Sequence, residues 1–521
     1  MTNTASLPRQ DSFWVNYFEQ QLVVQLEQVI RRIKRQGAPA LLPHMGSVFK
    51  LLEEAHRVSS AWPSAIRLIE EIHPWPVRWG YADRWLTELK FAEQLLQGQQ
   101  AERRRAELLA NLSDLYLHTH QYGLAIEMGE AAQTIARQTR SALVYAVGSS
   151  SIVGTLKAIG KHHEAGQAVA QAENELKTSG FRSSSRKYAE AAAILSLEKY
   201  DLLRRQGDIE EALHTVREHI NRIKSFPHPD VQLLGTLYEC RGVLYWSQSH
   251  YILATKDLDL ASECFKAGQN EVAQASAEAN RGLIFFSMAN YRQAEAALRN
   301  AIKLTQHCNY LSNLTRQIGN LGLVYWGRGM LDEARLYMQQ ALNMAIQTNN
   351  AGEMILETGN LATLQVYQGE FDAARPHLEE TVKSFRQLNN LEILCGALID
   401  LAICLHGLGE TEAAQQCARE AMQLAIEVKL DGPQVIAMRC LAHVGAAADP
   451  VEVLSKAQKQ AQQLNRRLDV VGCSVSLCRY AAPDEAAALW AQAEAELQSM
   501  GAEVWLQGRS PENPPLLPLC V

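Results

Sequence analysis

Residues 320–341 read NLGLVYWGRGMLDEARLYMQQA, and the chain repeats this pattern at a fixed interval. The stretches at 280–301 (NRGLIFFSMANYRQAEAALRNA), 360–381 (NLATLQVYQGEFDAARPHLEET) and 400–421 (DLAICLHGLGETEAAQQCAREA) align with it without gaps. Because the four starts, at positions 280, 320, 360 and 400, are evenly spaced, we infer a structural unit that recurs along the chain.

The same frame extends in both directions with weaker matches. The ten unit starts fall at residues 111, 151, 198, 240, 280, 320, 360, 400, 440 and 472. The longest step, from 151 to 198, contains the Ser-rich insertion GFRSSSRKY. The sequence therefore predicts one continuous array without an internal domain boundary.

Each unit is expected to hold two helices joined by a short turn. A small residue near the start, Gly282 or Gly322, lets the first helix approach the next one closely. Ala294 and Ala301 lie on one face of the second helix, with Leu298 between them. Such a pair has an apolar side that it cannot bury alone, so neighbouring pairs must stack. We therefore predict an all-α protein, an α-solenoid with a concave and a convex face.

The same residues resemble a known repeat family. In three units a glycine is followed three residues later by an aromatic residue: Gly242 and Tyr245, Gly282 and Phe285, Gly322 and Tyr325. With Ala294 and Leu298 after it, this pattern resembles the tetratricopeptide repeat, whose usual period is about 34 residues. The longer period is similar to that of kinesin light chains, LGN-type adaptors and bacterial signalling regulators. The resemblance covers roughly residues 105–500 and implies a right-handed superhelix of stacked antiparallel helix pairs.

Composition and charge narrow the class of protein. The 521 residues are 47% apolar, and only 31 are glycine and 16 proline, which favours a helical core over a disordered chain. The net charge of −7 argues against a nucleic-acid partner. The basic runs at 31–35 (RRIKR) and 103–105 (RRR) are short, and we interpret them as solvated helix faces.

Cysteine placement and hydropathy suggest a compartment. The ten cysteines are scattered through helix-like stretches, and none forms a CxxC pair, so we expect reduced thiols in a cytoplasmic protein. The first residues, MTNTASLPRQDSFW, lack the pattern of a secretory signal. No stretch approaches the roughly 18 apolar residues of a membrane span, so we expect no membrane partner.

The two ends differ from the array. Residues 1–104 hold five of the nine tryptophans: Trp14, Trp62, Trp75, Trp79 and Trp85. We interpret them as a helical cap or degenerate repeats, with a distinct binding head as the alternative. Residues 501–521 end in SPENPPLLPLCV, whose prolines forbid a helix. We expect a C-terminal tail there, or else a short ligand for a partner's groove.

The resemblance also points to groove residues. In tetratricopeptide arrays the first helix of each pair lines the concave groove, and an asparagine at the start of our frame holds a peptide main chain. This implies an amide ladder at Asn280, Asn320 and Asn360, with Asn111 as an outlying member; it lapses at Cys240 and Asp400. We expect six further groove residues: Trp246, Phe286, Trp326, His406, Arg281 and Arg316, the arginines for a carboxylate or phosphate. Alternatively, the asparagines bond between neighbouring helices and the aromatic residues fill the seam.

The sequence gives less support to a metal site or a catalytic site. His118 with His120, or His162 with His163, would need further ligands to hold a metal, and we expect no metal and no cofactor. Cys404 and His406 are two residues apart, so on a helix they face apart and form no nucleophile–base pair. The chain contains no GxxxxGK[ST], GxSxG or HExxH motif.

We therefore predict an interaction scaffold or adaptor without enzymatic activity, which binds a segment of a protein or peptide partner in its concave groove. One alternative is a regulatory sensor, in which a peptide or small ligand tightens the superhelix and alters what a separate effector meets. A second alternative is an enzyme whose site lies in the atypical N-terminal region.

Overall fold

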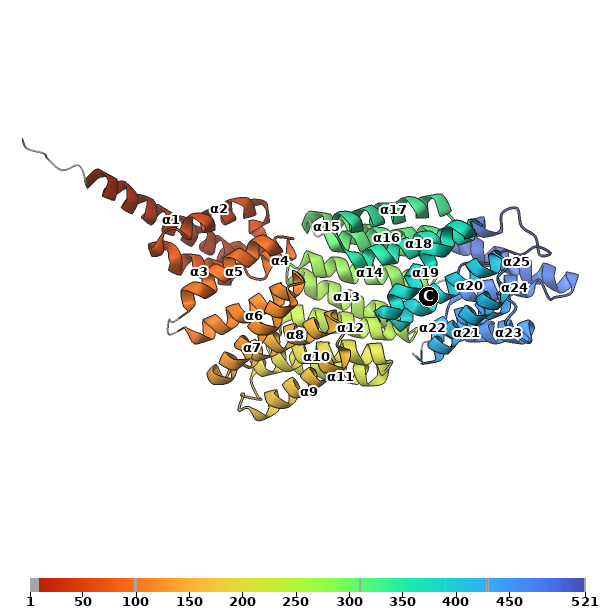
Figure 1. The fold of residues 1–521 in the computed structure, drawn as a ribbon, viewed down its shortest axis with the longest axis horizontal. Helices are drawn as coiled ribbons and strands as arrows, with labels where there is room; N and C mark the ends of the chain where they lie inside the picture. The colour runs from red at the N-terminus through yellow and green to blue at the C-terminus, as the bar shows by residue number, and fades with distance from the viewer. Residues whose placement is uncertain are drawn as a thin grey trace, which may run out of the picture. The chain divides into compact units, whose positions relative to one another are not determined.

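The structure is a computed structural model that describes residues 9–97, 101–308, 311–388, 390–427, 429 and 431–519. Within these ranges it consists of α-helices and short 3-10 helices, with no β-strand (Figure 1). The chain divides into two compact units, Met1–Lys199 and Tyr200–Val521. The sequence predicts an undivided array over 105–500, whereas this division falls inside α10, just after the Ser-rich insertion.

The first unit is helical throughout its described part. Its helices are α1 (Arg9–Gln36), α2 (Met45–Ala55), α3 (Trp62–Ile72), α4 (Trp75–Arg78), α5 (Ala82–Leu96), α6 (Glu102–His118), α7 (Tyr122–Thr139), α8 (Ala142–Ala158), α9 (His162–Thr178) and the first part of α10 (Arg186–Gln206). Trp85 is fully buried in a core that continues without interruption into Leu108 and Leu112 of α6. Trp14, by contrast, is 64% exposed.

The second unit carries the strong repeats. Its helices are α11 (Ile209–Lys224), α12 (Val231–Ser247), α13 (Tyr251–Ala267), α14 (Glu271–Ser287), α15 (Tyr291–Cys308), α16 (Leu311–Gly327), α17 (Leu331–Gln347), α18 (Ala351–Tyr367), α19 (Phe371–Gln387), α20 (Leu391–Gly407), α21 (Thr411–Glu427), α22 (Asp431–His443), α23 (Pro450–Gln463), α24 (Arg467–Leu477) and α25 (Pro483–Met500). The first helices of the pairs from α12 to α22 begin at evenly spaced positions: Val231, Glu271, Leu311, Ala351, Leu391 and Asp431. All ten predicted unit starts fall inside even-numbered helices from α6 to α24.

Local chemistry sets the helix boundaries at repeating positions. The side chains of Asn270, Asn350 and Asn390 each accept a hydrogen bond from a backbone N–H in the first turn of the following helix. The turns inside the pairs hold a residue of positive φ at one recurring position: Ser249, Ala289, Gly329, Gly369 and Gly409. A left-handed residue ends one helix and starts the reversal to the next.

Close contact between the two helices of a pair rests on the small residues that the sequence singles out. A Cβ atom on Gly322 would lie 2.8 Å from Met338 Cγ and 3.2 Å from the Ala334 carbonyl oxygen. Gly282 meets Leu298 in the same way, at 2.8 Å. The alanine that opens the apolar face of each second helix is fully buried in five successive repeats: Ala254, Ala294, Ala334, Ala374 and Ala414. These contacts confirm the predicted solenoid packing.

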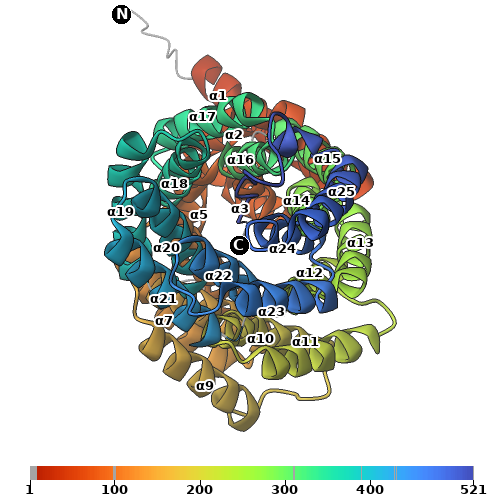
Figure 2. The same cartoon turned by 90° about the vertical axis from the view of Figure 1, so that its right-hand side faces the viewer.

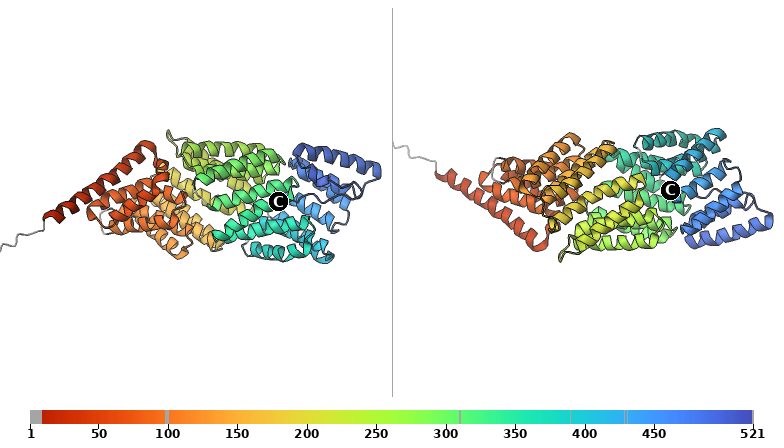
Figure 3. Two further views of the ribbon diagram at one scale, coloured as in Figure 1. Left: turned by 90° about the horizontal axis from the view of Figure 1, so that it is seen from above. Right: turned by 90° about the horizontal axis from the view of Figure 1, so that it is seen from below.

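The repeats of the second unit curve around a concave interior. Figure 2 shows α14, α16, α20, α22 and α24 on the inner side of this unit, with α13, α15, α17, α19 and α21 on the outer side. Figure 3 shows from two further sides how the helices of this unit stack on one another. The segment after α25 contacts an earlier repeat: Trp505 Nε1 donates a hydrogen bond of 3.1 Å to the carbonyl oxygen of Gly327, the last residue of α16.

The C-terminal segment differs from the expected tail. Leu517 is fully buried and Leu519 is 3% exposed, both packed against helices of the second unit. An extended segment can be buried there because Pro514, Pro515 and Pro518 have no N–H group that would need a partner. Among the described helices, none combines the length and the apolar content needed to cross a bilayer.

Candidate functional site

A cavity of about 240 Å³ lies among the inner helices of the second unit. Asn320, Asn360 and Asp400 line it, and they occupy equivalent positions of three consecutive repeats. Its remaining walls are mostly apolar and come from α14, α16, α17, α18, α19 and α20, with Leu519 of the C-terminal segment. The structure therefore brings two of the predicted ladder amides together and continues their row with a carboxyl group.

The three predicted ladder amides have different surroundings. Asn280 donates a hydrogen bond of 2.9 Å to Glu239 on α12, so it bridges neighbouring helices. Asn360 donates to Glu357 of its own helix at 3.3 Å. Asn320 is half-buried in the cavity wall, and no hydrogen bond of its side chain is found among the described residues. Asn280 therefore links two helices, which is the alternative role that the sequence leaves open. Asn320 is the amide most available to a ligand.

Carboxyl groups with raised pKa values accompany the amides. Burial raises the pKa of Glu357 to about 8; the hydrogen bond from Asn360 opposes this rise, and nearby Glu353 adds to it. Burial likewise raises the pKa of Asp400 to about 7, opposed by the hydrogen bond from Thr363. At neutral pH these groups are partly or largely protonated, so they can donate as well as accept hydrogen bonds.

Two of the predicted aromatic residues form one wall of the cavity. Phe286 and Trp326 both line it. The Trp326 ring packs edge-on against Tyr367 at 5.6 Å between centroids, and Tyr367 packs against Trp505 at 5.7 Å. Trp326 Nε1 is buried and makes no hydrogen bond within the described part of the chain.

The two predicted groove arginines are engaged in ion pairs. Arg281 Nη1 lies 2.8 Å from Asp259, and its Nη2 lies 2.7 Å from Glu278. Arg316 Nε donates to Glu353 at 2.8 Å, although its side chain is 61% exposed. Neither residue lines the cavity. An anionic ligand would have to compete with these carboxylates for either guanidinium.

The remaining predicted groove residues lie outside the cavity. Trp246 Nε1 donates a hydrogen bond of 3.0 Å to Ser287 Oγ on α14. His406 packs edge-on against His443 at 5.1 Å between ring centroids, and burial lowers its pKa, with Arg479 contributing to the shift. Both residues occupy seams between repeats, as the alternative interpretation of the aromatic positions proposes.

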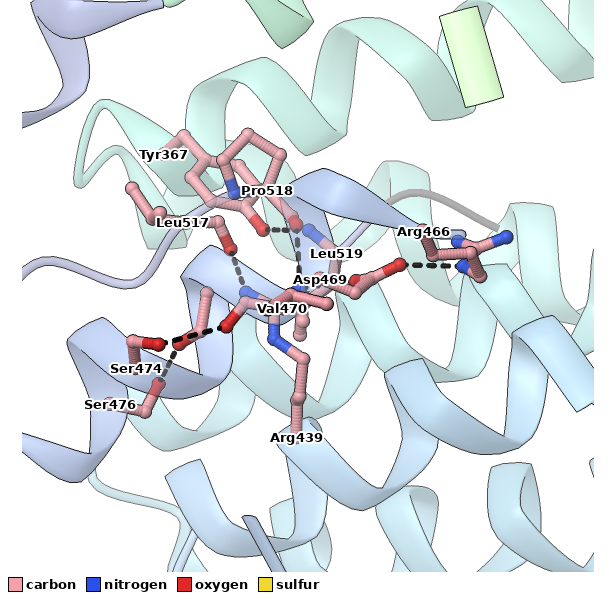
Figure 4. A network of polar contacts seen from close by, with 11 residues as sticks. Tyr367, Arg439, Arg466, Asp469, Val470, Ser474, Ser476, Leu517, Pro518 and Leu519 are labelled. Carbon is pink, nitrogen blue, oxygen red and sulfur yellow. Dashed lines mark hydrogen bonds and ion pairs between the residues drawn. The ribbon is translucent and has the colours of Figure 1, made fainter. Parts of the chain in front are cut away.

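The C-terminal segment forms a second polar network beside this cavity (Figure 4). Arg439 on α22 donates hydrogen bonds of 3.1 Å to the carbonyl oxygens of Leu517 and Pro518. The Leu519 N–H donates to the Tyr367 hydroxyl at 3.0 Å. Arg439 is itself buried, and an ion pair of 2.6 Å with Asp469 balances its charge.

Candidates for other chemistry have ordinary structural surroundings. His118 Nδ1 and the Asp114 carbonyl oxygen are 2.8 Å apart, and His120 Nδ1 lies 3.0 Å from the Tyr122 hydroxyl. In the described ranges no three His, Cys, Asp or Glu side chains group to hold a metal ion. Cys404 Sγ donates to the Phe371 carbonyl oxygen at 3.3 Å, and burial raises its pKa to about 11.

The cysteines with described side chains carry free thiols: Cys240, Cys264, Cys395, Cys404, Cys417, Cys440, Cys473 and Cys478. Cys308 and Cys520 lie outside the residues whose side chains the structure describes.

Comparison with known sequences supports the repeat assignment. The sequence model of the tetratricopeptide repeat matches residues 315–352, which cover most of α16, all of α17 and the beginning of α18. These residues form a tetratricopeptide-type repeat, as the sequence predicts. None of the curated protein sequences compared with it matches.

Three solved structures align with about 70% or more of this chain and with nearly all of their own length. A Rap protein complexed with competence and sporulation factor has 13% identity and a TM-score of 0.53, covering 69% of this chain and 99% of that one. Aspartyl phosphate phosphatase F from Bacillus subtilis has 14% identity and a TM-score of 0.42, covering 70% and 95%. The Rap conjugation gene regulator of plasmid pLS20, in complex with the Phr* peptide, has 12% identity and a TM-score of 0.37. The alignment covers 76% of this chain and 95% of that one. At 0.53, the first of these shows a shared fold.

Several site residues escape the repeat consensus. Asp400 occupies the ladder position but is not an asparagine, so the repeat pattern predicts a lapse of the ladder there. Glu357 lies three residues before Asn360 and packs against Gly319, which has no side chain to obstruct it. Tyr367 and Arg439 carry no signal in the repeat pattern, since their partners belong to a segment outside it.

One predicted ladder member lies in the first unit. Asn111 lines a separate cavity of about 360 Å³ there, together with Arg103, Arg140, Arg182 and Lys187. Glu70 and Glu107 line the same cavity, so its charge is mixed. Asn111 therefore belongs to a different pocket from the one that holds Asn320 and Asn360.

Proposed function

We propose that the concave side of the second unit binds an extended segment of a protein or peptide partner, with Asn320, Asn360 and Asp400 facing the ligand main chain. The observation that carries this proposal is the placement of three polar side chains, from equivalent positions of consecutive repeats, in one cavity. An amide both donates and accepts, so a row of amides suits the alternating N–H and C=O groups of an extended chain.

The surroundings of the row support a peptide ligand. Phe286 and Trp326 line the cavity and offer apolar contact to side chains, beside the polar groups that fix orientation. The Rap protein of similar fold was crystallised with competence and sporulation factor, a separate molecule. Burial raises the pKa of the Cys404 thiol, which makes this side chain a poor nucleophile.

A peptide library displayed on phage and selected against the full-length protein tests this proposal. Selected peptides are labelled, and their affinities for the wild type and for Asn320→Ala/Asn360→Ala are compared by fluorescence anisotropy. We expect at least about a tenfold loss, because two hydrogen-bonding groups leave the site. Asn300→Ala/Asn343→Ala, on exposed faces of α15 and α17, is the matched control. If Asn320→Ala/Asn360→Ala folds and binds the selected peptides with unchanged affinity, these residues do not bind the ligand and the proposal is wrong.

A second candidate function is regulation of a separate effector by the bound ligand. One observation favours it: Trp326 lines the cavity and also contacts Tyr367, which packs on Trp505 where the last elements return to α16. A ligand that moves Trp326 would therefore strain the contact between early and late repeats. Small-angle X-ray scattering with and without a selected peptide tests this, and an unchanged radius of gyration would exclude it.

A further inference from the structure

The C-terminal segment, residues 514–519, is held as a ligand would be held. It has no regular secondary structure, yet Pro514, Leu517, Pro518 and Leu519 are buried. No hydrogen bond joins its backbone to another backbone group in the described ranges. Its main chain is instead bound by side chains that project from the repeats.

Three side chains from different parts of the repeat array bind this main chain. Tyr367 on α18 accepts from the Leu519 N–H at 3.0 Å, and Arg439 on α22 donates to two successive carbonyl oxygens at 3.1 Å. Arg479, which follows α24, donates to the Pro514 carbonyl oxygen at 3.0 Å. The contacts therefore run along the whole segment, from residue 514 to residue 519, as Figure 4 shows for its C-terminal half.

The composition of the segment fits this mode of binding. Pro514, Pro515 and Pro518 have no N–H group, so their burial leaves no donor unsatisfied. Proline also fixes an extended backbone in advance, which reduces the entropy lost when the segment is bound. The buried side chains of Leu517 and Leu519 add apolar contact with the inner helices.

The segment reaches the cavity described above. Leu519 forms part of its lining, together with Asn320, Asn360 and Asp400. An extended ligand that runs along the row of amides and continues past Asp400 would meet the place where Leu519 lies. Both cannot occupy that place at once.

We propose that residues 514–519 are a tethered ligand of the concave groove, and that the partner of this groove is an extended, apolar, proline-containing peptide that competes with them. The idea of a partner rests on the proposed function, whereas the recognition of the segment by Tyr367, Arg439 and Arg479 does not. The segment keeps the groove partly closed until a partner of higher affinity displaces it. A tethered competitor weakens the apparent affinity of the partner, because only the molecules whose groove is open can bind it. The apparent Kd is the intrinsic Kd divided by the fraction of open molecules.

The test uses the full chain and a fluorescein-labelled peptide with the sequence of residues 511–521, carrying Cys520→Ser to prevent oxidation. The variant Leu517→Lys/Leu519→Lys should displace the tethered segment, because its ammonium groups would replace side chains that are buried in apolar clusters. The matched control, Gln507→Lys/Asn513→Lys, adds the same charge at two exposed positions. Circular dichroism checks that all three proteins are equally helical.

We expect the displaced variant to bind the labelled peptide at least about tenfold more tightly than the wild type and the control do. In the same background, Tyr367→Phe should weaken binding about two- to tenfold, since it removes the acceptor of the Leu519 N–H. Equal binding by the wild type and the displaced variant would overturn the proposal. Failure of the folded, displaced variant to bind would overturn it as well.

A second arm covers the case in which the displaced variant does not fold. A protease recognition sequence is inserted between Gly508 and Arg509, both exposed, and the purified protein is cleaved there. We expect the freed segment to exchange with the labelled peptide while the helices persist. If the protein unfolds after cleavage, or if the freed segment never exchanges with the labelled peptide, residues 514–519 are a permanent part of the core. Either result would refute the tethered ligand.

The two proposals fail in different ways. If the labelled peptide binds in trans but Asn320→Ala/Asn360→Ala leaves phage-selected peptides unaffected, the tethered ligand stands and the proposed function falls. If the selected peptides bind with the same affinity to the wild type and to the displaced variant, the groove function stands and the tethered competitor falls.

Discussion

Asp400 Oδ2 accepts a hydrogen bond of 2.8 Å from Thr363 Oγ1, which ties the first residue of one repeat frame to the helix of the preceding repeat. The same carboxyl group lines the cavity, where burial raises its pKa to about 7. Glu357, three residues before the Asn360 amide, has a pKa raised by burial to about 8. The row of amides therefore stands among carboxyl groups that hold protons near neutral pH.

These protons make stability depend on pH. A glutamate in the unfolded chain loses its proton near pH 4.5, whereas the folded protein keeps the Glu357 proton up to about pH 8. Between these values the folded state binds more protons, so the free energy of unfolding falls as pH rises, and it levels off above the folded pKa. We therefore expect the melting temperature of Glu357→Gln, measured relative to the wild type, to rise from pH 5 to pH 8.

Thermal unfolding followed by circular dichroism at four pH values between 5 and 8 measures this effect. Glu380→Gln is the control, because Glu380 lies on the outer helix α19 with 65% of its side chain exposed. A melting temperature with the same pH slope in Glu357→Gln as in the wild type would contradict the assignment of the proton to this carboxyl group.

The sequence predicts the repeats well for a physical reason. Positions such as Ala334 and Gly322 must be small because two helices meet there, and the same need recurs at the same place in each unit. The period of the sequence therefore predicts both the number of units and the positions of their helices. The asparagine row follows from the same frame, although only Asn320 and Asn360 share a cavity.

The residues that bind the C-terminal segment could not be predicted in this way. Tyr367 and Arg439 belong to different repeats, and only the curvature of the stacked repeats brings both to the same short segment. The segment itself has no period, so its burial depends on contacts that a repeat frame does not describe. A proline-rich end is typical of a tail, and here its missing N–H groups allow it to be buried.

The buried ion pair of Arg439 provides a stability prediction. Its side chain has no exposed surface, and Arg439→Met would leave the Asp469 carboxylate with Arg466 as its remaining partner. It would also remove both donors to Leu517 and Pro518. Breaking a buried pair from one side costs about 3–5 kcal/mol, so we expect a loss of that order, reduced by the contact with Arg466.

Urea unfolding of Arg439→Met, compared with Arg419→Met, measures this loss. Arg419 is exposed on α21 and bonds only to Gln415 of its own helix among the contacts described. Equal midpoints for the two variants would show that the ion pair and its contacts to the C-terminal segment contribute nothing to stability.

Helix contact within one repeat can be tested with one substitution at two places. In Gly322→Ala the new Cβ atom would press on Met338 and on the Ala334 backbone, so we expect a loss of about 1–3 kcal/mol. In Gly352→Ala the nearest atom is 3.7 Å away, and we expect a gain of about 0.5–1 kcal/mol from the better helix former. Urea midpoints should move in opposite directions. A shift of both in the same direction would argue against close packing at Gly322.

The recurring turn offers a reciprocal exchange. Ser249 and Gly369 occupy the same position of different repeats, with φ of 59° and 81°. A residue with a side chain is strained in this left-handed region by about 1–2 kcal/mol, and nothing lies within 4 Å of a Cβ atom on Gly369. Gly369→Ser should therefore destabilise the fold through the backbone alone, by about 1 kcal/mol. Ser249→Gly should stabilise it by less, because glycine loses more freedom on folding. Thermal midpoints of the two variants measure both effects, and a midpoint that rises in Gly369→Ser would show that backbone strain does not govern this turn.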